Sequence, residues 1–158
     1  MRWLFPRRAR PPADFVRIAP WLVLGSALSP AGYKELARAG ITHVLDLRSE
    51  ASDDPALMRR LGLGWRRVPV EDRAAPTTAQ LDEIERWLHS GDPDPVLYVH
   101  CEGGLGRSPT IAIALLMRRG FARAEAHRFV LTARSVAAPT SQQLAWLTEI
   151  EDSLRDRP

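Results

Sequence analysis

The chain has 158 residues, 45% of them hydrophobic, and a formal net charge of +3 at pH 7. This length and apolar content suit one α/β domain with a sizeable core, and the sequence contains no repeat, low-complexity tract or membrane-spanning apolar run. The single cysteine excludes an intrachain disulfide framework, and together with the lack of a secretion signal it predicts a reducing, cytoplasmic location.

The positive charge is concentrated at the start of the chain. Residues 1–13 contain four of the 22 basic residues and no acidic one, which leaves 18 basic against 19 acidic residues elsewhere. We therefore expect no nucleic-acid partner, and we interpret residues 1–13 as a disordered basic arm and residues 14–158 as the folded domain. The alternative is a weak contact of the arm with a membrane surface or a partner protein through Trp3, Leu4 and Phe5, without stable membrane insertion.

Strands and helices alternate along the predicted domain until residue 100, after which only helices follow. We expect strands at residues 17–26, 41–48, 65–70 and 95–99. We expect helices at residues 29–39, 55–61, 77–88, 108–119, 122–134 and 141–154. Gly40 and Gly62 stand where the first two helices end, and Thr77 with Gln80 has the spacing of a capping box. This alternation predicts a single domain with a central, mostly parallel, twisted sheet of four to five strands flanked by helices.

The most informative segment is His100-Cys-Glu-Gly-Gly-Leu-Gly-Arg-Ser108, which links an expected strand to an expected helix. Three glycines allow the chain to turn tightly there. The first backbone N–H groups of a helix are unpaired and lie at the positive end of the helix dipole, so a loop at this position can direct several of them at one anion. We expect this turn to bind phosphate. The segment Glu102, Gly103, Gly104, Leu105, Gly106 and Arg107 forms the predicted phosphate-binding loop.

Three side chains of this segment have the chemistry of phosphoryl transfer. Beside a helix N-terminus and a cationic group, the thiol of Cys101 is expected to be largely ionised and therefore nucleophilic near neutral pH. The planar guanidinium of Arg107 can hold two oxygens of a phosphoryl group. The hydroxyl of Ser108 is placed to donate a hydrogen bond to the sulfur, and it is also a candidate helix N-cap. His100 is expected to support the loop through hydrogen bonds rather than to act as an acid or base.

The pattern His-Cys-x-x-Gly-x-x-Arg-Ser is filled by His100, Cys101, Gly104, Arg107 and Ser108. It resembles the signature of the cysteine-dependent protein tyrosine phosphatase superfamily, and the arrangement of the whole domain is similar to that of the dual-specificity phosphatases. The resemblance covers roughly residues 15–154 and implies hydrolysis of phosphomonoesters through a phosphocysteine intermediate, with no metal or other cofactor. The pair Arg134-Ser135 departs from the Arg-Pro that is common in that family.

The resemblance also implies a general acid on a loop ahead of the nucleophile. Asp72 follows an expected strand in a proline-containing loop, 29 residues before Cys101, and is the candidate for protonating the leaving oxygen. Glu71 is its neighbour and remains an alternative, as does the reading of Asp72 as an ordinary exposed loop carboxylate. Arg73 could guide an anionic substrate or simply be a solvated surface residue.

The expected partner is a phosphorylated protein, carrying phosphotyrosine or also phosphoserine and phosphothreonine. Glu102 favours this reading, because a carboxylate in the loop repels multiply charged head groups, unless its side chain points to water. The alternatives are a phosphoinositide or RNA 5′-phosphate phosphatase of the same fold, a phosphate-binding pseudophosphatase, and a sulfurtransferase with a similar cysteine loop. The sequence does not predict the oligomeric state.

Overall fold

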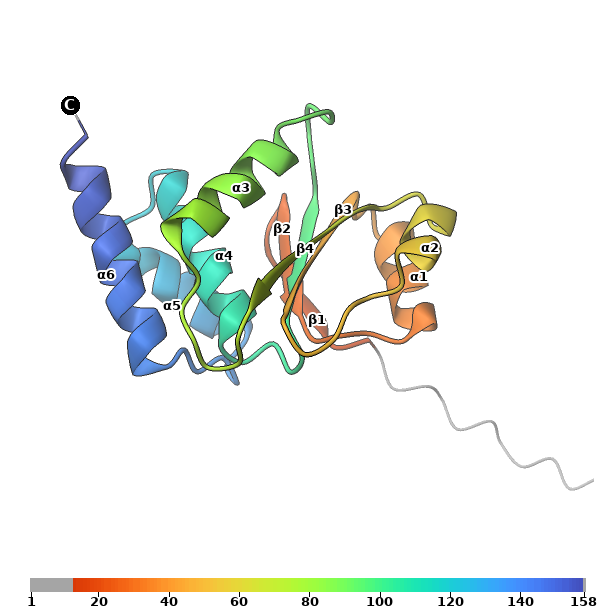
Figure 1. Ribbon diagram of the computed structural model, residues 1–158, viewed down its shortest axis with the longest axis horizontal. Coiled ribbons are helices and arrows are strands. Elements are labelled where there is room, and N and C mark those ends of the chain that lie inside the picture. Colours follow the sequence, from red (N-terminus) through yellow and green to blue (C-terminus); the bar gives the residue numbers. More distant parts are fainter. Residues whose placement is uncertain (1–12, 158) are drawn as a thin grey trace, which may run out of the picture.

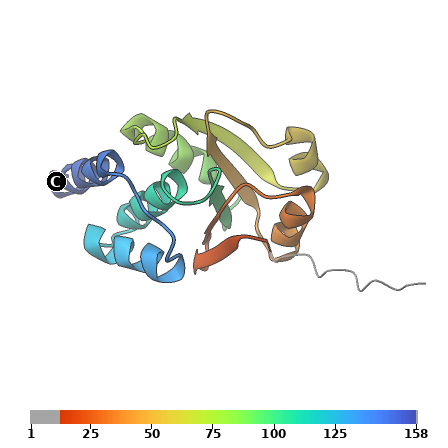
Figure 2. The ribbon, with the colours of Figure 1, turned by 90° about the horizontal axis from the view of Figure 1, so that it is seen from below.

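The structure, a computed structural model, describes residues 13–157 (Figure 1). Except for Ala13, the predicted basic arm therefore lies outside the described residues. A five-stranded sheet runs through the domain, and helices cover both of its faces, as the two perpendicular views show (Figure 2). This architecture confirms the predicted α/β class and the mostly parallel sheet.

The sheet has the strand order β1-β2-β5-β3-β4, which places the strand before Cys101 at its centre. Strands β2, β5, β3 and β4 are parallel, and only β1 runs antiparallel to its neighbour β2. The strands are β1 (Phe15–Ala19), β2 (Leu22–Gly25), β3 (His43–Arg48), β4 (Gly64–Val70) and β5 (Leu97–His100). Because parallel strands end at the same edge, the loops after β3, β4 and β5 meet there, at the lower edge in Figure 1.

The single strand predicted for residues 17–26 is wrong. The chain instead forms the antiparallel pair β1 and β2 with a tight reversal at Pro20 and Trp21. Proline lacks the N–H that a continuing strand needs, and it favours turns. The reversal pairs Phe15 with Gly25, so the start of β1 lies beside the end of β2 at the loop-bearing edge of the sheet.

The helices divide between the two faces of the sheet. Helices α1 (Pro30–Arg38) and α2 (Pro55–Arg60) cover one face. Helices α3 (Thr78–Leu88), α4 (Arg107–Arg118), α5 (Arg123–Ala133) and α6 (Ser141–Arg155) lie on the other. Successive side chains of a strand point to opposite faces, and β5 shows this clearly: Leu97 and Val99 join the core under α4, whereas Tyr98 joins the core under α1. Both faces of the sheet are therefore buried.

Capping residues begin helices α1, α3 and α6 where the sequence predicts. Ser29 accepts a hydrogen bond from the Gly32 N–H at the start of α1. Thr77 and Gln80 form the predicted capping box of α3, and Thr140 and Gln143 form a second one at α6. Within residues 13–157, no helix combines the length and the apolar composition needed to cross a membrane.

Helix α4 is buried along its length, from Arg107 to Met117. It packs on the sheet and contacts α3, α5 and α6, which explains an almost unbroken apolar sequence over Ile111–Met117. Its N-terminus follows the end of β5 after six loop residues. The core thus holds the start of α4 firmly against the central strand.

The packing of α4 can be tested by core truncation. Ile113 is fully buried, so Ile113→Ala should lower the free energy of unfolding in urea by about 2–5 kcal/mol through lost burial and an unfilled cavity. Thr148→Ala, at an exposed position of α6, is the control and should change it by less than about 0.5 kcal/mol. Equal effects of the two substitutions would contradict this description of the core.

Candidate active site

The sole cysteine lies at the junction of β5 and the loop that leads into α4. Cys101 is 3% exposed, and its Sγ atom lies 3.3 Å from the hydroxyl oxygen of Ser108. This contact agrees with the predicted hydrogen bond to sulfur. The alternative role of Ser108 as N-cap is wrong, because Ser108 is the second residue of α4 and Gly106 occupies the N-cap position without a side-chain cap.

The peptide groups of the loop share one orientation, with their carbonyl oxygens bound to the rest of the protein and their N–H groups left unpaired within residues 13–157. Every carbonyl oxygen from Cys101 to Gly106 accepts a protein hydrogen bond. The donors are His100 Nδ1 (2.9 Å), Ala27 N (3.0 Å), Arg134 Nη2 (2.9 Å), Arg134 Nε (2.8 Å), Ala138 N (2.6 Å) and Thr110 N (3.0 Å), in that order. Within the described residues, none of the N–H groups of residues 102–108 donates to a protein acceptor. Unpaired N–H groups beside a helix N-terminus form an anion-binding site.

Only one loop glycine has the left-handed backbone conformation that favours glycine. Gly104 has φ +66°, and a Cβ atom there would lie 2.6 Å from the carbonyl oxygen of Gly25. At Gly106 a Cβ atom would lie 3.0 Å from the Gln143 side chain. The tight turn predicted from three glycines therefore depends on φ at one position and on close packing at another.

The guanidinium of Arg107 is buried and already oriented. Glu50, in the loop after β3, accepts from Nη2 at 2.6 Å and from Nη1 at 2.8 Å, and the Val70 carbonyl also accepts from Nη1 at 3.0 Å. The hydrogen bonds and charge of Arg107 lower the pKa of Glu50 to about 2, and Glu50 in turn raises the pKa of Arg107. Glu50 was not predicted from the sequence, and it fixes the plane of the guanidinium.

Asp72 lies near Arg107, as a general acid for the same phosphate site would require. Its Oδ1 atom is 3.6 Å from Arg107 Nη2, and its side chain is 77% exposed. Glu71 is also exposed but makes no ion pair with Arg107 among the described residues, which favours Asp72 over its neighbour. Arg73 is exposed and has φ +66°, a strained conformation for a residue with a side chain.

The loop that carries Asp72 is tied to the start of α6. Thr140 donates its hydroxyl to the carbonyl of Arg73 at 2.9 Å, and the Gln143 amide donates to the carbonyl of Ala74 at 3.0 Å. Gln143 is fully buried and packs against Gly106. The same side chain therefore contacts both the acid-bearing loop and the phosphate-binding loop.

A buried polar network lies beneath the loop. His100 is fully buried, with Nδ1 facing the Cys101 carbonyl and Nε2 lying 2.7 Å from Asp53. Because a carbonyl only accepts, Nδ1 carries a proton and donates to the Cys101 carbonyl, a contact that agrees with the expected supporting role. Burial would raise the pKa of Asp53, but hydrogen bonds and charge from His100, with hydrogen bonds from Tyr33 and Trp65, bring it below its ordinary value.

Arg48 connects this network to the loop. It pairs with Asp46 at 3.0 Å and Asp53 at 3.1 Å inside the protein, and with Glu102 at 3.0 Å toward the surface. The Glu102 side chain is 66% exposed and does not point freely to water, since Arg48 holds its carboxylate. Asp46, Asp53 and His100 have potential metal-ligand atoms within 4.8 Å of one another, but a cation there would face the Arg48 guanidinium that already occupies both carboxylates.

Comparison with known proteins agrees with this geometry. The family model described as "PTP-SAK: Swiss Army Knife protein, DSP-PTPase phosphatase domain" matches residues 19–154. The chain belongs to this DSP-PTPase family. Dual specificity phosphatase 28 of Homo sapiens is 35% identical over 150 residues, covering 91% of this chain and 81% of that protein.

Solved structures of phosphatases share the fold. The crystal structure of human DUSP28 has a TM-score of 0.78 and 32% identity, covering 92% of this chain and 97% of that one. The crystal structure of Tk-PTP in the active form has a TM-score of 0.78 and 28% identity, covering 88% and 97%. The predicted resemblance to dual-specificity phosphatases is thereby confirmed, and membership of the family supports phosphatase activity.

Several residues around the phosphatase site were not predicted from their local sequence. Glu50, Arg48 and Asp53 lie in or just after β3, at the edge where the loops of a parallel sheet meet. The position of β3 beside β5 is the signal that could have directed attention to them, because ligands bind outside the carboxyl ends of such strands. Asp14 carried no comparable signal, since it lies 120 residues from its partner Arg134 and meets it only in the fold.

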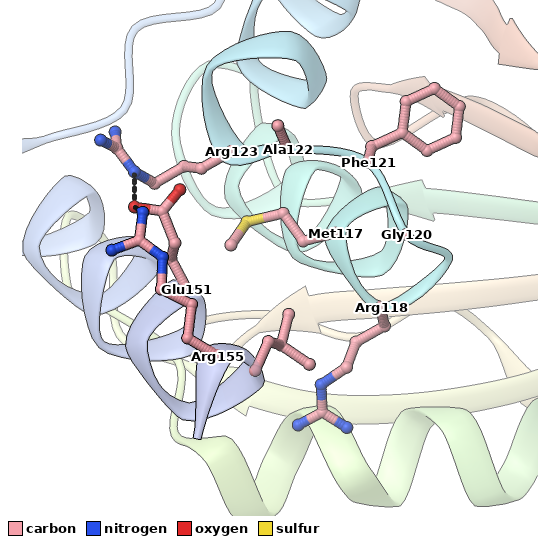
Figure 3. A pocket seen from close by; sticks show the side chains of 9 residues that line it. Met117, Arg118, Gly120, Phe121, Ala122, Arg123, Glu151 and Arg155 are labelled. Carbon is pink, nitrogen blue, oxygen red and sulfur yellow. Dashed lines mark ion pairs between the residues drawn. The ribbon is translucent and has the colours of Figure 1, made fainter. Parts of the chain in front are cut away.

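A hollow of about 430 Å³ lies at the end of α4 that is remote from the phosphate-binding loop (Figure 3). Its arginines are paired with acidic residues: Arg123 and Arg155 each lie 3.4 Å from Glu151, and Arg118 lies 2.7 Å from Glu85. Met117 points into the hollow between them (Figure 3). Its charged groups are thus paired within the protein, unlike the N–H groups of the phosphate-binding loop.

The role of Glu50 can be tested by an isosteric change. Glu50→Gln keeps the size of the side chain but removes the charge that orients Arg107, and it should lower kcat/KM for p-nitrophenyl phosphate about tenfold or more. Glu149→Gln, at an exposed position of α6, is the matched control and should leave kcat/KM unchanged. Unchanged kcat/KM in Glu50→Gln would show that Arg107 needs no carboxylate partner.

The Glu50–Arg107 pair also predicts a pH dependence. The pKa of Glu50 falls from an ordinary 4.5 to about 2 on folding, so the pair stabilises the folded state above the ordinary value and is lost as the pH falls toward 2. Carbon-13 NMR of the Glu50 carboxyl should therefore show it ionised at pH 4. A midpoint close to 4.5 would contradict the bidentate contact with Arg107.

Proposed function

We propose that this phosphatase hydrolyses phosphomonoesters on phosphoproteins, with phosphotyrosine as a substrate and phosphoserine and phosphothreonine as further ones, through a phosphocysteine intermediate. The observation that carries the proposal is the orientation of the loop that follows Cys101, whose N–H groups lack protein acceptors among residues 13–157. A phosphoryl group with three equatorial oxygens suits such a cluster of donors.

The first step transfers the phosphoryl group to sulfur. The Cys101 thiolate attacks phosphorus, a P–S bond forms, and the bond to the ester oxygen breaks. Asp72 donates its proton to that oxygen, so the leaving group departs as an alcohol or phenol. The loop N–H groups and the Arg107 guanidinium stabilise the charge on the equatorial oxygens throughout.

The second step returns the enzyme to its starting state. The Asp72 carboxylate accepts a proton from water, and the resulting nucleophile forms a new P–O bond while the P–S bond breaks. Ser108 donates a hydrogen bond to the departing thiolate, at the 3.3 Å separation found here. Inorganic phosphate leaves, and no metal ion takes part in either step.

The charges around the site support a protein substrate over a polyanionic one. Glu50, Asp72 and Glu102 are all partly exposed carboxylates near the loop. Arg107 and Arg48 neutralise two of them only in part, so a head group with several phosphates would meet repulsion. A phosphorylated side chain brings a single phosphate and fits this balance better than a phosphoinositide or an RNA 5′ end.

The proposed chemistry predicts three separable effects on p-nitrophenyl phosphate hydrolysis. Wild-type activity should persist in EDTA. Cys101→Ser should abolish it, because serine at that position is a poor nucleophile without a base. Asp72→Asn should lower kcat by about 100-fold or more, because water must then be activated without a base. An active Cys101→Ser variant would contradict the mechanism, and an inactive wild-type chain that still binds tungstate would indicate a phosphate-binding pseudophosphatase.

The substrate class can be decided by comparing kcat/KM values for candidate substrates. We expect kcat/KM on phosphotyrosine peptides to exceed that on soluble phosphoinositides and on a 5′-phosphorylated RNA, at equal ionic strength. Glu102→Gln should reduce the difference in kcat/KM between peptide and phosphoinositide substrates, since it removes one charge that repels the phosphoinositide. Preference of the wild-type enzyme for lipid or RNA would overturn the assignment, and thiosulfate turnover would indicate a sulfurtransferase.

A further inference from the structure

Arg134 holds two consecutive peptide groups of the phosphate-binding loop. It is the residue that follows α5, it is 7% exposed, and it donates from Nε to the Gly104 carbonyl at 2.8 Å and from Nη2 to the Gly103 carbonyl at 2.9 Å. These are two of the six loop carbonyls that accept protein hydrogen bonds. A charged donor makes them stronger than the bonds from backbone N–H groups elsewhere in the loop.

Holding a carbonyl fixes the direction of the N–H on the same peptide group. A trans peptide is planar, and its C=O and N–H point in opposite directions. By binding the Gly103 and Gly104 carbonyls, Arg134 directs the N–H groups of Gly104 and Leu105 away from itself. Both of these N–H groups lack acceptors among the described residues. A reversed peptide would instead place a carbonyl dipole against the anion.

Asp14 in turn orients Arg134. Its two carboxylate oxygens accept from Nη1 and Nη2, both at 2.9 Å. These hydrogen bonds lower the pKa of Asp14 and raise that of Arg134, so both groups stay charged near neutral pH. The Asp14 carbonyl also accepts from the Ser26 N–H at 3.2 Å, which fixes Asp14 beside the end of β2.

The space around Gly104 allows the loop little freedom to rearrange. A Cβ atom on Gly104 would lie 2.7 Å from Arg134 Nη2 and 2.6 Å from the Gly25 carbonyl oxygen. Gly25 itself packs against the Asp14 backbone, where a Cβ atom would lie 2.2 Å from the carbonyl oxygen. Asp14, Gly25, Gly104 and Arg134 thus form one closely packed unit.

We propose that Arg134, oriented by Asp14, is a positioning residue that sets the anion affinity of the phosphate-binding loop. It touches the loop carbonyls and acts on the phosphoryl group only through the N–H groups of Gly104 and Leu105. The inference rests on the loop being the phosphoryl site of the proposed function. It gives the first described residues of the domain a role in phosphate binding, although Asp14 precedes the phosphatase match at residues 19–154.

The test measures tungstate binding by calorimetry and thermal stability by differential scanning for the same variants. Asp14→Asn removes the charge from a side chain that is 58% exposed, so the protein should fold with a small change in Tm. Its dissociation constant for tungstate should rise about tenfold, since a charged partner of Arg134 is lost. Asp14→Glu should recover most of the affinity, and Arg134→Lys should not, because lysine lacks the planar set of donors that holds two carbonyls and the Asp14 carboxylate at once.

Glu83→Gln is the matched control, since Glu83 pairs with Arg66 at 3.1 Å on the surface and neither residue contacts the loop. It should leave the tungstate dissociation constant unchanged. The proposal is overturned if Asp14→Asn and Arg134→Lys bind tungstate within twofold of the wild type, whatever their Tm. Tungstate binding needs no turnover, so an inactive wild-type chain would contradict the proposed function alone.

Truncation ahead of or after Asp14 offers an independent test. A chain that begins with Met followed by Asp14 should bind tungstate and turn over p-nitrophenyl phosphate like the full chain. A chain that begins with Met followed by Phe15 should show the weakened binding of Asp14→Asn. Equal affinity of the two truncated chains would contradict the role of Asp14.

Discussion

Within residues 101–108 the carbonyl groups face the protein and the N–H groups do not, and this orientation governs the whole candidate site. Six carbonyls accept hydrogen bonds from the protein, while within residues 13–157 no N–H group from Glu102 to Ser108 has a protein acceptor. Unpaired N–H groups cost free energy unless an anion or water satisfies them. The fold maintains this arrangement because β5 and α4 belong to the buried core, as do three of the residues that hold the carbonyls, His100, Thr110 and Arg134.

The donors to these carbonyls come from separate parts of the chain. Ala27 follows β2, Arg134 follows α5, and Ala138 lies ahead of α6, so the loop takes its shape from nearly the whole domain. Arg107 is oriented by Glu50 from the loop after β3, and Asp72 comes from the loop after β4. In the proposed mechanism only a few side chains take part in the chemistry, whereas many residues are needed to hold them in position.

Local patterns predicted most of the elements and the loop between β5 and α4 well, because glycines, prolines and capping residues act within a few positions of their place in the chain. Thr77 with Gln80 and the segment His100–Ser108 are examples. The reversal at Pro20 was missed because both short strands share one apolar run. Glu50 and Asp14 could not be found from the sequence, since their partners Arg107 and Arg134 are brought to them only by the packing of the sheet and helices.

A crystal structure with tungstate bound to the Cys101→Ser variant tests the central claim most directly. We expect tungstate beside residue 101, with its oxygens within hydrogen-bond distance of the N–H groups of residues 102–108 and of the Arg107 guanidinium. The Gly103 and Gly104 carbonyls should still face Arg134. Tungstate bound elsewhere, or a loop whose carbonyls face the anion, would contradict the account.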